Sequence, residues 1–307
     1  MRSPHRFKDL LIILIITQFI ACTASQNQRP VVIGSPVRIG GVLVPAEVAI
    51  PRPSGVEIEK AKDSLNAFLS NVDPDTRQIL NTYPDLLAIR PPEINTAIIP
   101  DLSPRFVARH NENKEVAKAG DIDLLFMGDS ITDWWRSERE NYAGKPVFDR
   151  YFGNMKVANF GIAGDTTQGV LYRLQNGEGE DFSPKAIMLM IGTNNTRANT
   201  GPEIAEGVGA IVLEMQQRFP RAKILLLAVF PRSTPADPVR EKIAEINQII
   251  AKLHDGKNIF YMDIGNIFLD QNGVIPVEIM SDGLHPTTKG YELWAEAVKD
   301  PLAQLLK

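Results

Sequence analysis

The chain has 307 residues, of which 44% are hydrophobic and 23% are charged, a composition typical of a globular protein with a sizeable core. Its formal net charge of −4 lacks the basic excess of nucleic-acid-binding proteins, so a nucleic-acid partner is not expected. A single cysteine excludes a disulfide within the chain.

Residues 1–24 have the pattern of an export signal. Three basic residues occur in the first eight positions, and a continuous apolar run occupies 10–16. This run is too short to span a bilayer, which takes about 20 apolar residues, but it suits a secretory signal peptide. Cys22 ends the apolar segment, so two outcomes are open: lipid attachment at Cys22, which would anchor the protein to a membrane, or cleavage after Ala24. In both cases we expect export.

Residues 25–104 contain half of the 22 prolines, which disfavours long regular elements because proline fixes φ and lacks an N–H donor. The spacing of apolar residues predicts helices over 56–69 and 75–81, and short strands are expected within 31–50. We interpret this region as a linker or a small appended module of unknown role.

Residues 105–307 are interpreted as one domain in which strands and helices alternate. After a helix over 105–118, apolar runs predict strands at 124–127, 155–159, 186–191, 224–229 and 259–264. Helices are predicted at 131–142, 167–174, 202–218, 238–253 and 287–306. Continuous apolar strands separated by helices indicate a parallel sheet that is covered on both faces. The fold class is therefore α/β, a three-layer α/β/α sandwich, with functional sites expected at the carboxyl ends of the strands.

Ser130 is the first residue that points to chemistry. It ends the motif Gly-Asp-Ser (128–130), which follows the strand predicted over 124–127 and opens a helix. A serine hydroxyl is a weak nucleophile at neutral pH and needs a base that takes its proton. The alternative is that Ser130 only caps the helix. Thr132 stands where a G-x-S-x-G elbow has its second glycine, which disfavours the α/β-hydrolase fold.

Asp282 and His285 form an Asp-x-x-His motif in front of the last predicted helix. On a turn, this spacing lets the carboxylate reach the imidazole, fix its tautomer and stabilise its protonated form. Alternatively, the aspartate caps a helix and the histidine lies at the surface. His110 and His254, the other histidines beyond the signal, are interpreted as a packing or surface residue and as a helix C-terminal cap. His285 is therefore the best candidate for a general base.

Gly164 and Asn194 lie in two loops that follow predicted strands. The loop over 159–165 is rich in glycine, which permits close backbone approach, so a backbone N–H can point at a developing oxyanion. The loop over 192–195 offers an asparagine side chain as a further donor to the same oxyanion. Ordinary turn chemistry is the alternative explanation for each loop.

Trp134 and Trp135 follow Ser130 by one helical turn. Their rings could line a subsite for the acyl group or for a sugar. The alternative is that at least one of them packs against the sheet.

Four sequence blocks thus point to chemistry: Gly-Asp-Ser, the loop over 159–165, the loop over 192–195 and Asp-x-x-His. Together they resemble the SGNH, or GDSL, hydrolases, in which serine, glycine, asparagine and histidine occur in this order. The resemblance covers residues 105–307 and is closest to the brain-type platelet-activating-factor acetylhydrolase catalytic subunits, to which the runs 159–167 and 192–195 are similar. As in that subfamily, Asn195 replaces the aspartate that most of the family has at this position.

The resemblance implies a flavodoxin-like fold and ester hydrolysis that needs neither a metal nor another cofactor. It implies that Ser130 is the nucleophile, that His285 is its base and that Asp282 orients His285. The implied oxyanion hole consists of the N–H groups of Ser130 and Gly164 and the side chain of Asn194.

The predicted export separates this chain from the brain enzymes, which are intracellular. We therefore expect a small-molecule or glycan ester as substrate, short acetyl esters above all, and O-acetylated carbohydrate more than lipid. Two alternatives are open. The same residues could transfer an acyl group to cell-wall or other extracellular carbohydrate, or the domain could be a binding module without catalysis.

Overall fold

The computed structural model describes residues 35–89 and 93–307. The predicted signal over 1–24, with Cys22, lies outside these residues. Among the helices that are described, none has both the length and the apolar character that a membrane crossing requires.

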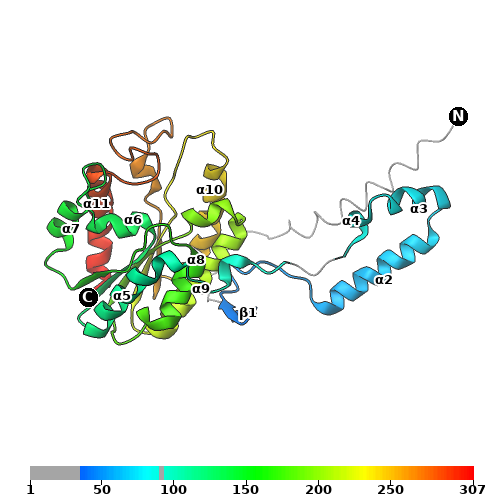
Figure 1. The fold of residues 1–307 in the computed structure, drawn as a ribbon, viewed down its shortest axis with the longest axis horizontal. Helices are drawn as coiled ribbons and strands as arrows, with labels where there is room; N and C mark the ends of the chain where they lie inside the picture. The colour runs from blue at the N-terminus through cyan, green and yellow to red at the C-terminus, as the bar shows by residue number, and fades with distance from the viewer. Residues whose placement is uncertain (1–34, 90–92) are drawn as a thin grey trace. The chain divides into compact units, whose positions relative to one another are not determined.

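Five parallel strands form the central sheet (Figure 1). They are β3 (Leu124–Gly128), β4 (Val157–Asn159), β5 (Ala186–Met190), β6 (Lys223–Leu227) and β7 (Ile259–Met262). Their order in the sheet is β4-β3-β5-β6-β7, and the five predicted strands are confirmed with slightly shifted ends. Leu124 in β3 pairs with Val157 on one side and with Ala186 on the other, so the first strand of the sheet lies inside it.

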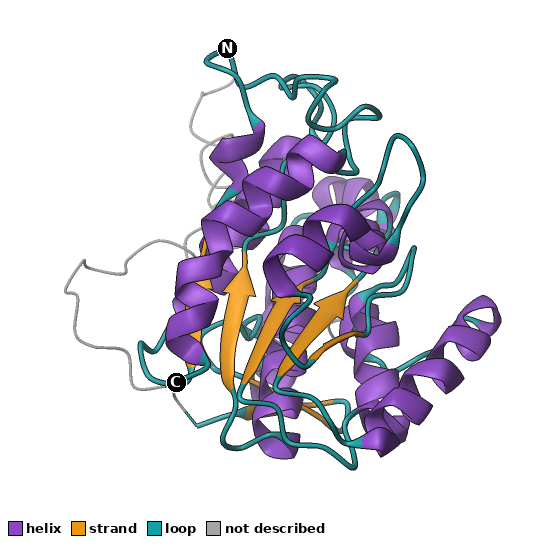
Figure 2. Ribbon diagram, turned by 90° about the vertical axis from the view of Figure 1, so that its left-hand side faces the viewer, coloured by secondary structure: helices purple, strands orange, loops and turns teal. Residues whose placement is uncertain are grey.

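Helices cover both faces of this sheet (Figure 2). They are α5 (Val107–Ala119), α6 (Ser130–Asp133), α7 (Lys145–Phe152), α8 (Thr167–Arg173), α9 (Gly201–Arg218), α10 (Val239–Ile250) and α11 (Thr288–Leu305). Successive side chains of a strand point to opposite faces. Leu125 and Met127 therefore pack with α5, α8, α9 and α10, whereas Leu124 and Phe126 pack with α6, α7 and α11. The predicted three-layer α/β/α sandwich is confirmed.

Short helical turns extend or connect these elements. They are η2 (Thr96–Ile98), η3 (Pro104–Phe106), η4 (Trp134–Arg136), η5 (Leu174–Glu178), η6 (Thr193–Arg197), η7 (Ala251–Leu253) and η8 (Gly265–Phe268). All are 3₁₀ turns except η5, a wider turn whose backbone leaves helical geometry at Asn176 and Gly177.

The helix predicted over 131–142 is wrong beyond Arg136. After α6 and η4 the chain leaves the helical path and turns back at Gly144, where a Cβ would collide with the backbone of Trp134. The helix α7, which was not predicted, begins directly after this turn with Pro146 in its first turn, a position that proline favours.

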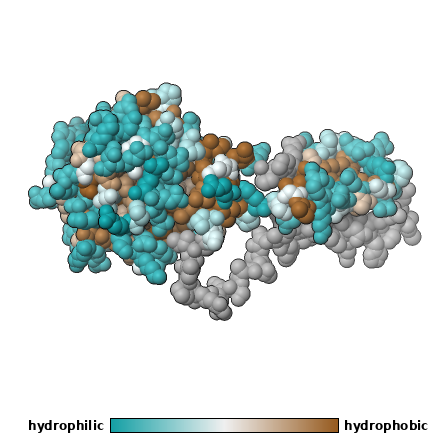
Figure 3. All heavy atoms as spheres, turned by 90° about the horizontal axis from the view of Figure 1, so that it is seen from below, coloured by the Kyte–Doolittle hydropathy of each residue, from teal (hydrophilic) through white to brown (hydrophobic). Residues whose placement is uncertain are grey.

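The N-terminal region begins with an antiparallel pair, β1 (Val37–Ile39) and β2 (Val42–Val44). The helices α2 (Gly55–Asn71), α3 (Pro74–Asn81) and α4 (Pro84–Leu87) follow, so the two predicted helices are confirmed with longer limits. Ser54 and Glu57 form a capping box at the start of α2. No residue of α2 or α3 is buried, and Figure 3 shows apolar side chains, in brown, at their surface.

Glu206 of α9 connects both sides of this helical segment to the core. Its buried carboxylate accepts the backbone N–H of Ile50 (2.9 Å), pairs with Arg52 (2.7 Å) and accepts the side-chain amide of Asn95 (2.8 Å). Burial alone would raise the pKa of Glu206, but these hydrogen bonds outweigh burial and lower it. Apolar side chains on both sides, among them Val48, pack into the core, so the core extends upstream of residue 105.

Candidate active site

Ser130, His285 and Asp282 form a continuous hydrogen-bonded row. The Ser130 Oγ lies 2.9 Å from the His285 Nε2, and the His285 Nδ1 lies 2.6 Å from the Asp282 Oδ2. Ser130 is buried, whereas the side chains of His285 and Asp282 are 15% and 37% exposed. The structure therefore brings together three residues that the sequence separates by up to 155 positions, and the imidazole and carboxylate remain partly exposed to solvent.

The order of the strands explains why this row forms at β3. The next strand in sequence, β4, lies on one side of β3, and the following one, β5, lies on the other. The connections that leave β3 and β5 therefore diverge, an arrangement in which ligands typically bind at the carboxyl ends of the strands. Ser130 follows β3 at this edge of the sheet, Gly164 follows β4, and Asn194 follows β5.

A tight turn holds His285 in place. The Asp282 Oδ1 accepts the backbone N–H groups of Leu284 (3.0 Å) and His285 (2.8 Å), while the Oδ2 faces the imidazole. Burial alone would raise the pKa of Asp282, but the hydrogen bonds from the His285 side chain and backbone lower it, so the carboxylate is ionised at neutral pH. The His285 Nδ1 then carries the proton that this carboxylate accepts, and the Nε2 is free to accept from Ser130.

A hydrogen bond joins the loop that carries Gly164 to the side chain of Asn194. Gly164 has a φ of +85°, a conformation that favours glycine, and no acceptor in the described part of the chain takes its backbone N–H. The Asn194 Nδ2 donates to the carbonyl of Asp165 (2.8 Å), the residue that follows Gly164. An amide nitrogen has two N–H groups, so one remains for a ligand. The structure thus brings the side chain of Asn194 into contact with the loop that carries Gly164, two of the three predicted oxyanion donors.

The model of the GDSL-like lipase/acylhydrolase family matches residues 126–293. The chain belongs to this family. Platelet-activating factor acetylhydrolase IB subunit alpha2 of Rattus norvegicus is 36% identical to it over 204 residues, which are 66% of this chain and 86% of that protein. The alpha1 subunit of Homo sapiens is 30% identical over 203 residues, which are 66% of this chain and 84% of that protein.

A solved structure from Bacteroides fragilis, described as that of an acylhydrolase, shares the fold. Its TM-score is 0.55 at 20% sequence identity, and the match covers 67% of this chain and 100% of that one. The resemblance inferred from the four sequence blocks is confirmed. As a member of the GDSL-like family, the chain is a hydrolase that acts on esters.

In this family member, the side chain of Asn195 connects two elements next to the site. Its Oδ1 accepts the backbone N–H of Thr167 (3.0 Å), and its Nδ2 donates to the Gln168 Oε1 (2.8 Å). Asn195 is buried and is satisfied on both its donor and its acceptor side. It therefore holds the start of α8 against η6, the turn that carries Asn194.

The two tryptophans after Ser130 have different places. The Trp134 ring lies 4.1 Å from the His285 ring, centroid to centroid, with an interplanar angle of 30°. Trp135 is fully buried and packs against Phe126 and Trp294 in the core. One tryptophan is thus a core residue, and Trp134 forms one wall of the site and restricts the orientation of the imidazole.

The two other histidines of the described chain are structural. The His110 Nδ1 lies 2.8 Å from the Glu178 Oε1 in the protein interior. His254 follows η7, and its Nδ1 accepts the backbone N–H of Tyr261 (3.1 Å). The packing and capping roles predicted for them agree with these contacts, which leaves His285 as the histidine at the site.

Arg173 is fully buried and contacts the loop that carries Gly164. Its guanidinium pairs with Asp165 (2.8 Å) and with Glu178, and all three side chains are excluded from solvent. Burial raises the pKa of Asp165, and the charge of Arg173 opposes that rise. This ion-pair network fixes Asp165, whose carbonyl in turn accepts from Asn194.

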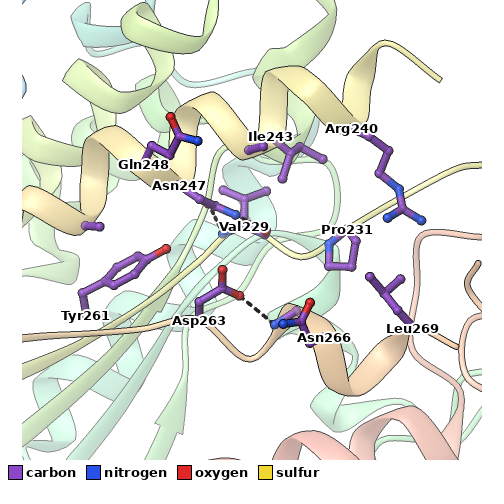
Figure 4. Close-up of a pocket in the computed structure, with 13 residues that line it drawn as sticks. Val229, Pro231, Arg240, Ile243, Asn247, Gln248, Tyr261, Asp263, Asn266 and Leu269 are labelled. Carbon is purple, nitrogen blue, oxygen red and sulfur yellow. Dashed lines mark hydrogen bonds between the residues drawn. The ribbon is translucent and has the colours of Figure 1, made fainter. Parts of the chain in front are cut away.

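A separate pocket of about 450 Å³ lies between α10 and the chain after β7 (Figure 4). Pro231, Arg240, Tyr261 and Asp263 line it, and its lining within the described chain includes none of the active-site residues above. Burial raises the pKa of the Tyr261 hydroxyl, so this group stays neutral. Among residues 35–89 and 93–307, no three His, Cys, Asp or Glu side chains are grouped to hold a metal ion.

Asp129 directly precedes Ser130 in the chain and is fully buried. Its Oδ1 accepts the backbone N–H of Ile131 (3.0 Å), whereas its Oδ2 has no hydrogen-bond partner among the described residues. Burial raises the pKa of Asp129 to about 7 from an ordinary value of 3.8. This aspartate therefore retains its proton over much of the acidic range.

Between pH 4 and pH 7, folded Asp129 holds a proton that the unfolded chain has lost, so its contribution lowers the free energy of unfolding as the pH rises. The full shift corresponds to about 4 kcal/mol. Asp129→Asn cannot titrate, so its stability relative to the wild type should increase between pH 4 and pH 8 by up to about 4 kcal/mol. Urea unfolding of both proteins at pH 4, 6 and 8 measures this. A difference that does not change with pH would show that Asp129 does not titrate in this range.

Proposed function

We propose that this protein hydrolyses short-chain carboxylic esters, above all acetyl esters, through Ser130, His285 and Asp282. The observation that carries the proposal is the row of two hydrogen bonds, 2.9 Å from serine to histidine and 2.6 Å from histidine to aspartate. A nucleophile, a base and a group that orients the base are the three parts that acyl transfer through a serine requires.

In the proposed mechanism, the His285 Nε2 takes the proton of Ser130 as the Oγ attacks the ester carbonyl. Asp282 stabilises the imidazolium that forms. Hydrogen bonds from the N–H groups of Ser130 and Gly164 and from the free N–H of Asn194 stabilise the negative charge that develops on the carbonyl oxygen. His285 then protonates the departing alcohol, which leaves an acyl-enzyme. Water attacks this ester with the same base, and the acid is released.

The preference for acetyl groups rests on the relatives, whose names describe them as acetylhydrolases. The identity of the alcohol rests on the sequence alone. Export, with or without lipid attachment at Cys22, would bring the enzyme to O-acetylated carbohydrates outside the cytoplasm. We therefore propose an acetylated glycan or another small acetyl ester as the substrate, and acyl transfer to such a carbohydrate as the alternative.

Turnover of 4-nitrophenyl acetate, butyrate and octanoate, with labelling by a fluorophosphonate probe, tests this function. We expect acetate to react fastest and the probe to label Ser130, because only an activated serine reacts with it. Adding a sugar acceptor and identifying the products separates hydrolysis from transfer. Folded protein that neither turns over any ester nor takes the label would overturn the proposal.

A further inference from the structure

Arg232 lies between the two loops that bring Asn194 and His285 to the site. Its Nη1 lies 3.3 Å from both the carbonyl oxygen and the hydroxyl of Thr193, the residue before Asn194. The next residue, Ser233, donates its backbone N–H to the carbonyl of Gly283 (2.7 Å), within the turn that holds His285. The guanidinium of Arg232 therefore lies against the loop that carries Asn194, close enough to Asp129 and Asp282 for their charges to raise its pKa.

Most of the donors of this guanidinium are unused. A guanidinium has five N–H groups in a fixed fork that suits carboxylate and phosphate oxygens. Only the Nη1 of Arg232 bonds to an acceptor within residues 35–89 and 93–307, and no carboxylate of these residues forms an ion pair with it. Three carboxylates lie near enough to act on Arg232, and none of them pairs with it: Asp237 bonds with Ser233, Asp282 bonds with His285, and the buried Asp129 accepts the backbone N–H of Ile131. A half-buried cation with free donors is suited to an external acceptor.

A second arginine adds positive charge at the same place. Arg197 ends η6, the turn that begins with Thr193, and it is exposed to solvent. Burial and then the charge of Arg197 lower the pKa of Arg232, because two like charges close together disfavour each other. An anion bound between them would relieve both effects.

The loop that carries Arg232 is held rigidly. The Arg240 Nε donates to the carbonyl of Arg232 (2.6 Å), and its Nη2 donates to the carbonyls of Ser233 (3.1 Å) and Gly273 (3.2 Å). Figure 4 shows Arg240 reaching from α10 toward the loop at Pro231. The backbone that presents Arg232 is thus fixed before any ligand arrives, which lowers the entropic cost of binding.

We propose that Arg232, with Arg197 beside it, binds an anionic group of the ester substrate, a carboxylate or phosphate close to the scissile bond. This inference rests on the proposed function, and it adds that the natural substrate is an acidic ester. The anion could belong to the alcohol or to the acyl part, and matched pairs of esters distinguish the two. They are 4-acetoxybenzoate against its neutral methyl ester, and 4-nitrophenyl hydrogen succinate against 4-nitrophenyl butyrate.

The measured quantity is the ratio of kcat/KM for the anionic ester to that for its neutral partner. We expect the wild type to favour the anionic member of at least one pair. Arg232→Gln should lower this ratio about 10- to 100-fold, and Arg197→Gln several-fold, because a hydrogen bond to a charged group is lost. Arg221→Gln is the matched control, since it removes the same charge at an exposed position before β6, at the opposite end of the sheet. It should leave the ratio unchanged.

Binding provides a readout that does not depend on turnover. Calorimetric titration of Ser130→Ala protein with 4-acetoxybenzoate and with 4-nitrophenyl hydrogen succinate, with and without Arg232→Gln, should show at least a tenfold weaker affinity without the arginine. Equal ratios in the wild type and both arginine variants, or no difference in binding, would overturn the anionic site. If the wild type turns over the neutral and the anionic esters of each pair equally well, the anionic site is also overturned, but the proposed function stays intact. Anions that bind through Arg232 to a protein that turns over no ester would instead overturn only the proposed function.

Discussion

Ser130→Ala should lower kcat for 4-nitrophenyl acetate by about 10⁴- to 10⁶-fold, the range seen when a serine hydrolase loses its nucleophile. His285→Ala should cost nearly as much, and the double variant should be no worse than either single one. The reason is that the 2.9 Å contact between the Ser130 Oγ and the His285 Nε2 makes the two side chains one functional unit. Steady-state kinetics on the three variants, with circular dichroism to confirm folding, measures this.

Asn194→Ala is the graded control for this prediction. It removes one of three oxyanion donors and leaves the nucleophile and base intact, so the expected loss is about 10²- to 10³-fold. A Ser130→Ala protein that keeps most of its activity would remove this serine from the mechanism. Additive losses in the Ser130 and His285 double variant would show that the two residues act separately.

Arg173→Met should destabilise the fold by about 3–5 kcal/mol, the cost of breaking a buried ion pair from one side. The methionine fills a similar volume, but Asp165 and Glu178 then remain buried without their cation. Burial already raises the pKa of Asp165, and without the arginine this carboxyl avoids part of the penalty by taking up a proton, so the loss should be larger at pH 8 than at pH 5. Urea unfolding at both pH values measures the free energy of unfolding.

Arg218→Met makes the same change at a partly exposed ion pair with Glu214 and serves as the control. Because such pairs contribute little, its effect should stay below about 1 kcal/mol. Equal losses in the two variants would mean that the buried charges of the Arg173 network add nothing to the fold. Loss of esterase activity in folded Arg173→Met protein would indicate that the network also positions Asp165 and, through it, Asn194.

The strands could be predicted, and the candidate site residues named, because their signals are local. Each strand is a continuous apolar run, and the residues of the site follow strand ends or an Asp-x-x-His turn. The helix over 131–142 was wrong because its end depends on tertiary packing: Gly144 must fit against the backbone of Trp134, which no local pattern shows. The short helix α7 was missed for the same reason.

Long-range polar contacts could not be predicted either. The bond between Glu206 and Asn95 joins residues 111 positions apart, and the position of Arg232 depends on a bond from Ser233 to Gly283. The burial that raises the pKa of Asp129 is equally invisible in the motif Gly-Asp-Ser. The sequence was enough to name the candidate residues of the site, whereas the electrostatics around them required the arrangement in space.

Glu206 gives the helices α2 to α4 the character of an insertion. The chain leaves the core at Arg52 and returns at Asn95, and both residues bind this one carboxylate. The ends of the excursion are therefore already neighbours, and the entropy of closing it grows only with the logarithm of its length. The intervening segment can thus lengthen, shorten or be exchanged for another module at little cost to the catalytic domain.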